Sequence, residues 1–117
     1  MQFSAAGGYV EMTSSGPATP DLVKQMYQQA AQLAKIHGVQ KILVNVRHIH
    51  LTYDVDALYA VVDYLANIMG DFKIARLINL DEFKQDLIED LAKEKRLHLR
   101  NFEHRDDAVN WLNTATD

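Results

Sequence analysis

Two histidines, two aspartates and an arginine lie within eleven residues, in the stretch VRHIHLTYDVD at positions 46–56. Histidine with aspartate is typical of metal sites and of general acid–base pairs. His48 and His50 would lie on the same side of an extended chain, where Asp54 or Asp56 could add an oxygen ligand. However, H-x-H is a short pattern that arises often by chance, and catalytic zinc normally takes three well-placed protein ligands. The sequence therefore does not predict a metal site.

The rest of this stretch does not resemble the active site of a familiar enzyme. The chain has no cysteine, and neither an activated serine nor a glycine-rich phosphate loop accompanies the histidines. We therefore predict a protein that is not an enzyme and has no cofactor. Arg47, placed where a strand meets a helix, could hold a phosphate or carboxylate. An ion pair between Arg47 and Asp54 or Asp56 is the simpler expectation.

The composition indicates one soluble domain, residues 1–117. Of the 117 residues 48% are hydrophobic and 24% are charged, which is enough for a core of ordinary size. The formal net charge is −4 and the basic residues are scattered, so no nucleic-acid partner is expected. The absence of cysteine is compatible with a reducing cytoplasm. We expect no signal peptide and no membrane span, although the protein could still lie on the inner face of a membrane.

Strand and helix signals alternate along the chain. A helix should begin at the sequence Thr19-Pro20-Asp21, since threonine caps helices and proline suits the first helical position, and it should end at Gly38. The other predicted helices lie at residues 54–69, 81–96 and 105–112. The predicted strands lie at residues 2–5, 9–13, 41–46, 72–80 and 97–102. Residues 14–17 (SSGP) are predicted to end the second strand.

This order predicts an α/β fold with a mixed five-stranded sheet and four helices. Three consecutive strand–helix–strand units imply right-handed crossovers between parallel strands. The first two strands form an antiparallel hairpin around Gly7 and Gly8. Ile42, Leu43 and Val44 are apolar in succession, which is typical of a parallel strand buried on both faces.

The helix predicted at residues 54–69 is apolar over an arc of roughly 200°, wider than the roughly 100° needed to cover a sheet. Its apolar face comprises Leu58, Val61, Val62, Leu65, Ile68 and Met69, flanked by Tyr59, Tyr64 and Ala66. Neighbouring helices could cover the excess. Otherwise this surface meets a second subunit, a protein partner, or an apolar ligand held between helix and sheet.

Three segments resemble the SpoIIAA-like family, whose members are related to the STAS domains of anti-anti-sigma factors. They are the strand KILVNVRHI from residue 41, the strand KIARLI from residue 73 and the ending FEHRDDAVNWL from residue 102. The ending is the most specific, and the resemblance runs over about residues 2–113. It implies a SpoIIAA-like, STAS-like fold.

The resemblance also bears on function. In STAS switch proteins a serine at the start of a helix is phosphorylated, but Val55 and Asp56 stand at about that position here. Thr52 is the only aliphatic hydroxyl in the stretch, and its expected role is to cap the helix. Asn45 replaces the usual strand aspartate. The phosphorylation switch is therefore not carried over.

CRAL-TRIO domains, which SpoIIAA-like proteins resemble in fold, bind lipids beneath mobile helices. We accordingly expect a carrier or sensor of a small hydrophobic, lipid-like ligand, with peripheral membrane association. Tyr59, Tyr64, Leu65 and Met69 would line or gate the pocket, and Arg47 would hold a polar head. The alternative is a STAS-type module that binds a protein partner, or a second copy of the chain, through the same helix. The predicted binding residues are Arg47, His48, His50, Thr52, Tyr59, Val62, Tyr64, Leu65 and Met69.

Overall fold

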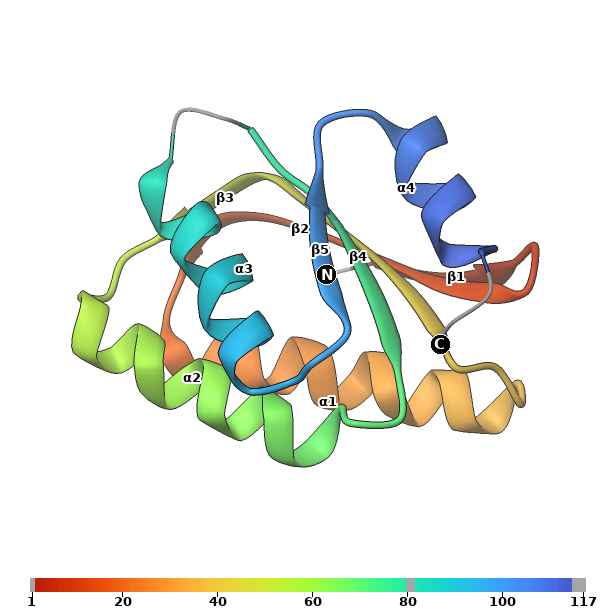
Figure 1. Cartoon of the computed structure of the whole chain (residues 1–117), viewed down its shortest axis with the longest axis horizontal. Coiled ribbons are helices and arrows are strands. Elements are labelled where there is room, and N and C mark those ends of the chain that lie inside the picture. The colour runs from red at the N-terminus through yellow and green to blue at the C-terminus, as the bar shows by residue number, and fades with distance from the viewer. Residues whose placement is uncertain (1, 80–81, 115–117) are drawn as a thin grey trace.

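The computed structural model describes residues 2–79 and 82–114. Its five strands form one sheet in the order β1-β2-β3-β4-β5, in which β1 is antiparallel to β2 and all other neighbours are parallel (Figure 1). The strands are β1 (Gln2–Ala6), β2 (Tyr9–Ala18), β3 (Lys41–Leu51), β4 (Lys73–Leu77) and β5 (Leu99–Phe102). The helices are α1 (Pro20–Ile36), α2 (Val55–Ile68), α3 (Phe83–Glu94) and α4 (Arg105–Leu112). The predicted fold class is thus confirmed.

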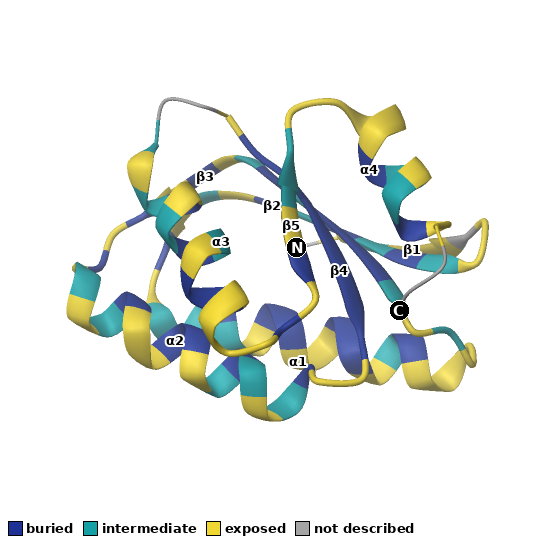
Figure 2. Ribbon diagram, in the orientation of Figure 1, coloured by how far each residue is buried: buried dark blue, intermediate teal, exposed yellow. Residues whose placement is uncertain are grey.

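The strand order explains how the helices are distributed. Each step from β2 to β5 moves one place in the same direction across the sheet, so right-handed crossovers put α1, α2 and α3 on one face. A large apolar core lies between this face and the three helices. The other face carries α4, with a smaller core of Leu43, Ala75, Leu77, Ala108 and Leu112. Strand β4 lies between the two layers and is buried along its whole length (Figure 2).

Most local signals act as the sequence indicates. Gly7 and Gly8 form a two-residue hairpin turn with φ of 66° and 81°, values that glycine adopts readily. Thr19 caps α1, because its hydroxyl oxygen accepts a hydrogen bond from the backbone N–H of Leu22 at 3.2 Å. The strand predicted at 72–80 and the helix predicted at 81–96 extend over Leu80 and Asp81, which lie outside the described residues.

The central strands are longer than predicted. Residues 14–17 do not end β2, which continues to Ala18, and β3 continues to Leu51 rather than stopping at Val46. The two extensions pair with each other, from Ser15 opposite His48 to Ala18 opposite Leu51. A register shift precedes them, since the pair Thr13–Asn45 is followed by Ser15–His48, which leaves one extra residue on β3. The polar stretch therefore begins as a bulged strand.

Two side-chain contacts hold α4 against its face of the sheet. Lys73 on β4 is a buried residue whose ammonium donates hydrogen bonds to the carbonyl oxygens of Trp111 (2.5 Å) and Thr114 (3.0 Å), near the end of α4. At the start of the helix, both Nη atoms of Arg105 donate to the carboxylate of Glu11 on β2, at 2.8 and 2.6 Å.

None of the helices in the described part of the chain has the length and apolar character that a membrane span requires.

Candidate functional site

The histidines of the polar stretch lie on the outside of β3. His48 and His50 are exposed, whereas Ile49 and Leu51 alternate with them and are buried, so the two histidines share one side of the strand as predicted. Within residues 2–79 and 82–114, no three histidine, aspartate or glutamate side chains form a group that could hold a metal ion.

The side chain of Arg47 forms a hydrogen bond that the sequence did not indicate. Its Nη2 donates to the carbonyl oxygen of Glu103 at 2.7 Å, and its own carbonyl oxygen accepts from Nδ2 of Asn79 at 2.5 Å. The expected ion pair with Asp54 or Asp56 is wrong. The cause is the longer β3, which places Arg47 four residues before the strand ends, so that its side chain reaches the connection between β5 and α4.

The prediction that Thr52 caps the helix at the start of α2 is also wrong. Asp54, not Thr52, caps the helix, since Oδ1 of Asp54 accepts from the backbone N–H of Ala57 at 2.9 Å. The hydroxyl of Thr52 instead donates to the carbonyl oxygen of Ala18 at 2.9 Å and extends the β2–β3 pairing by one contact.

A polar cavity of ≈ 120 Å³ lies beside these residues, and we call it the edge cavity. It sits where the parallel strands end, the place at which open α/β sheets usually bind ligands. Arg47 and His50 of the predicted site are in its wall. The full lining is Val46, Arg47, Ile49 and His50 from β3, Asn79 and Glu82 from the loop after β4, and Gln85 from α3.

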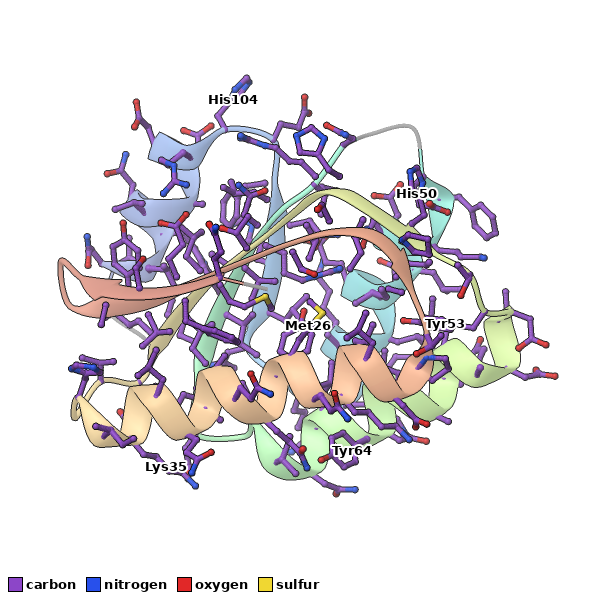
Figure 3. The ribbon with its side chains drawn as sticks, turned by 180° about the vertical axis from the view of Figure 1, so that it is seen from behind. Met26, Lys35, His50, Tyr53, Tyr64 and His104 are labelled. Carbon is purple, nitrogen blue, oxygen red and sulfur yellow. The ribbon has the colours of Figure 1, made fainter. Side chains whose placement is uncertain are left out.

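A second cavity lies between the sheet and α1, α2 and α3, and we call it the core cavity. Its volume is ≈ 20 Å³, which is room for about one water molecule. Its walls are mainly apolar: Val23, Met26 and Tyr27 of α1, Val46, Ile49 and Leu51 of β3, Val61, Val62 and Leu65 of α2, and Ile88 of α3. Tyr53 and Arg76 complete the lining. Figure 3 shows Met26 pointing from α1 toward the sheet and Tyr53 near the start of α2.

Arg76 is an arginine in the interior of the protein. It lies in the middle of β4, only 3% exposed, and its Nη atoms donate to the side-chain oxygens of Gln85 (2.5 Å) and Asn101 (3.3 Å). Both acceptors are neutral, and the ion pairs formed by the described residues do not include Arg76. Its Nε is buried and, among those residues, has no hydrogen-bond partner. Taking an unpaired charge out of water costs roughly several kcal/mol.

The carboxylate in this network, that of Glu89, is hydrogen-bonded to the backbone and does not pair with Arg76. A carboxylate oxygen of Glu89 on α3 accepts the backbone N–H of Asn101 at 2.6 Å, and Nδ2 of Asn101 donates to the backbone carbonyl of Gln85 at 2.7 Å. Arg76 is thus held by two amide side chains, of which that of Asn101 is itself fixed by a hydrogen bond to α3. This arrangement fixes the guanidinium but leaves its charge without an adjacent carboxylate among the described residues.

Tyr53 supplies the second polar group of the core cavity. Its hydroxyl is buried and has no hydrogen-bond partner within the described part of the chain. Burial raises the pKa of Tyr53 to about 12, while the positive charge of Arg76 acts in the opposite direction. The hydroxyl therefore keeps its proton at neutral pH and is available as a donor.

The residues at α2 that were predicted to line a pocket do not all lie in one place. Val62 and Leu65 line the core cavity, whereas Met69 is fully buried in the same core outside that lining. Tyr64 faces α1, where its hydroxyl accepts from Nε2 of Gln28 (Figure 3). Tyr59 is 47% exposed. The wide apolar arc is explained mainly by α1 and α3, which both pack against α2.

Arg76, Gln85 and Tyr53 were not predicted. One signal for Arg76 was present in the sequence, because a charged residue in the middle of the apolar strand KIARLI must be buried if that strand lies at the centre of the sheet. Gln85 and Tyr53 carried no comparable signal. Their role depends on how α3 and the β3–α2 connection pack on the sheet.

Among solved structures, the chain is similar to an uncharacterized protein of the DUF3478 family with a SpoIIAA-like fold from Shewanella loihica PV-4. The TM-score is 0.63 at 16% sequence identity, over 95% of this chain and 90% of that one. This chain has a SpoIIAA-like fold. The resemblance seen in the sequence is therefore confirmed at the level of fold. No protein-family model and no curated protein sequence matches the chain.

Proposed function

We propose that this protein is a non-enzymatic binding domain that holds a small amphiphilic molecule between its sheet and helices. One observation carries the proposal: the walls of the core cavity are mainly apolar, and two of the polar residues in them, Tyr53 and Arg76, each have a buried polar atom without a partner among the described residues. Ligand sites generally combine apolar walls with a few polar groups that fix the ligand's orientation. Such unpaired groups cost stability, so a binding role accounts for their presence.

The size of the core cavity limits the ligand. A volume of ≈ 20 Å³ holds no acyl chain, so a ligand larger than water must displace side chains. The edge cavity offers the way in, because both cavities have Val46 and Ile49 in their walls. Gln85 lines the edge cavity and is hydrogen-bonded to Arg76, which lines the core cavity. Movement of the Gln85 side chain would join the two spaces.

Native mass spectrometry of the protein, purified without added lipid, tests this function. A bound small molecule that is lost on organic extraction is expected. Val62→Ile adds one methylene to the cavity wall and should reduce the bound fraction, whereas Val55→Ile makes the same change at a half-buried position of α2 outside the cavity lining. A ligand-free protein, or equal loading of both variants, would count against the core cavity.

Transient contact with the inner face of the membrane is part of this proposal, since an amphiphilic ligand would be exchanged there by a cytoplasmic carrier. Among residues 2–79 and 82–114, the large exposed apolar side chains are Ile36, Tyr59 and Phe83, and a few such residues are normal on a protein surface. Liposome flotation checks the contact. Protein that stays entirely in solution in the presence of anionic vesicles would remove membrane association from the proposal.

A regulatory module that binds another protein is the second candidate, and the SpoIIAA-like fold together with two exposed aromatic residues favours it. Phe83 is 64% exposed at the start of α3 and Tyr59 is 47% exposed on α2. Lys84 connects the start of α3 to the segment before α2, because its ammonium donates hydrogen bonds to the carbonyl oxygens of Leu51 (3.2 Å) and Tyr53 (2.8 Å). Such aromatic side chains are enriched at protein interfaces.

Affinity capture with defined variants tests this candidate. A partner that is retained by the wild-type protein and by Ile36→Ser, but not by the double variant Tyr59→Ser/Phe83→Ser, would support docking at the start of α2 and α3. Ile36 is a suitable control because it is 72% exposed at the far end of α1. Equal capture by all three proteins would exclude this surface.

A further inference from the structure

We infer that the ligand carries a carboxylate, which Arg76 and Tyr53 bind inside the core cavity. This inference rests on the proposed function and names the chemical class of its ligand. Both polar groups that lack partners among the described residues, Nε–H of Arg76 and the hydroxyl of Tyr53, can donate a hydrogen bond. A carboxylate is an acceptor with two oxygens and one negative charge, so it would satisfy both donors and also neutralise the guanidinium.

The neutral surroundings of Arg76 favour an anionic ligand over water or an alcohol. Within the described part of the chain, its Nη atoms donate hydrogen bonds only to the side-chain oxygens of Gln85 and Asn101, and the other residues in the wall of the core cavity carry no charge. A water molecule could satisfy the two free donors but would leave the charge unpaired. Charge-assisted hydrogen bonds are roughly twice as strong as neutral ones, so an acid is bound in preference to an alcohol of the same shape.

Gln85 links the entry of the ligand to the binding of its carboxylate by Arg76. Its side-chain oxygen accepts from Nη2 of Arg76 at 2.5 Å, and its side chain is also in the wall of the edge cavity. A carboxylate arriving through the edge cavity competes with this amide oxygen for the guanidinium. When the amide is displaced, the edge cavity of ≈ 120 Å³ opens onto the core cavity, and Val46 and Ile49, which line both spaces, offer contacts to the apolar part of the ligand.

The test is isothermal titration calorimetry at pH 7 with two probes of equal length, hexanoate and hexan-1-ol. We expect hexanoate to bind at least about tenfold more tightly than hexan-1-ol, because only the acid neutralises Arg76. Octanoate should bind more tightly than hexanoate, by about fourfold for each methylene that is fully buried.

Two variants with matched controls test whether the carboxylate of hexanoate binds at Arg76 and Tyr53. Gln85→Glu places a carboxylate of the protein beside Arg76 and should weaken hexanoate binding by about tenfold or more, while Gln29→Glu makes the same change at an exposed position of α1. Tyr53→Phe removes only the hydroxyl and should weaken binding by about tenfold or more, while Tyr59→Phe, on the exposed part of α2, should not. Thermal unfolding of each variant shows whether it is folded.

The outcomes separate the inference from the proposed function. If hexan-1-ol binds as tightly as hexanoate, the cavity takes a ligand but the carboxylate assignment is overturned. If neither probe binds, both the assignment and the proposed function fail, and the core cavity holds only water. If hexanoate binds equally well to the wild-type protein, Gln85→Glu and Tyr53→Phe, it binds elsewhere and the assignment is overturned.

Discussion

Nη2 of Arg76 on β4 donates a hydrogen bond of 2.5 Å to the side-chain oxygen of Gln85 on α3, and both residues are at least 97% buried. This contact joins the sheet to the helix that flanks both cavities. Because a neutral amide only partly compensates a buried guanidinium, the pair stabilises the fold while leaving the charge available to a ligand.

Removing the amide should therefore destabilise the protein. Gln85→Leu leaves Nη2 of Arg76 buried without its acceptor, and we expect the free energy of unfolding to fall by about 2–4 kcal/mol, measured by urea denaturation. The double variant Arg76→Met/Gln85→Leu should recover part of the loss, because it also removes the charge. A double variant less stable than Gln85→Leu would show that the cost is one of packing rather than of an unpaired charge.

The hydroxyl of Tyr53 should not contribute to stability at neutral pH. It is buried without a partner among the described residues, so Tyr53→Phe should be at least as stable as the wild-type protein, and by up to about 1 kcal/mol more stable, in thermal unfolding at pH 7. A loss above about 1 kcal/mol would mean that the hydroxyl has a partner in solution.

Alkaline pH should destabilise the protein through Tyr53. The pKa of Tyr53 is raised from 10.0 to about 12, so between these values the unfolded chain binds fewer protons than the folded one. The free energy of unfolding therefore falls as the pH rises through this window. Tyr53→Phe should lose less stability than the wild-type protein between pH 10 and 12. Parallel curves of stability against pH for the two proteins would contradict the raised pKa.

The Glu11–Arg105 pair should show the opposite dependence on pH. The hydrogen bond and the charge of Arg105 lower the pKa of Glu11 below its ordinary value of 4.5, although burial opposes them. The pair therefore stabilises the fold above that pH, and the contribution disappears as the pH falls through the lowered pKa. Since Arg105 is 43% exposed in its side chain, Arg105→Ala should cost only about 0.5–1 kcal/mol at pH 7. The same cost at a pH at which Glu11 is fully protonated would show that the loss is not electrostatic.

The two candidates for the cap of α2 can be compared directly. Asp54→Ala removes the acceptor of the Ala57 N–H and should lower the free energy of unfolding by about 1 kcal/mol. Thr52→Ala removes only an exposed hydroxyl bonded to the Ala18 carbonyl and should cost about 0.5 kcal/mol or less. Chemical denaturation measures both. A larger loss for Thr52→Ala would restore the assignment made from sequence.

The sequence predicted the class of the fold because its strongest signals are local. The glycine turn, the Thr19 cap and the alternation of strand and helix are each specified by a few adjacent residues. The length of β3 was missed because residues 47–51 extend a strand only when Ser15–Ala18 pair beside them, and that pairing is set by the sheet. The same limit applied to Arg47, whose contact with Glu103 crosses 56 positions of the chain.

The candidate site was predicted only in part. Val62 and Leu65 were found because helical periodicity places them on the face that meets the sheet, and both line the core cavity. Tyr64 and Met69 share that helix but do not line the cavity, since periodicity gives a face and not a depth. Arg76 and Gln85 come from different elements, and their meeting depends on how α3 crosses the sheet.

The central claim is that a ligand binds in the core cavity, and methionine methyl groups test it most directly. Met26 lines that cavity, whereas Met12 and Met69 are equally buried in the same core without lining it. In a protein labelled with ¹³C at the methionine methyls, titration with hexanoate should shift the Met26 signal in NMR spectra well beyond those of Met12 and Met69. A Met26 signal that stays in place, or three signals that shift together, would contradict binding in this cavity.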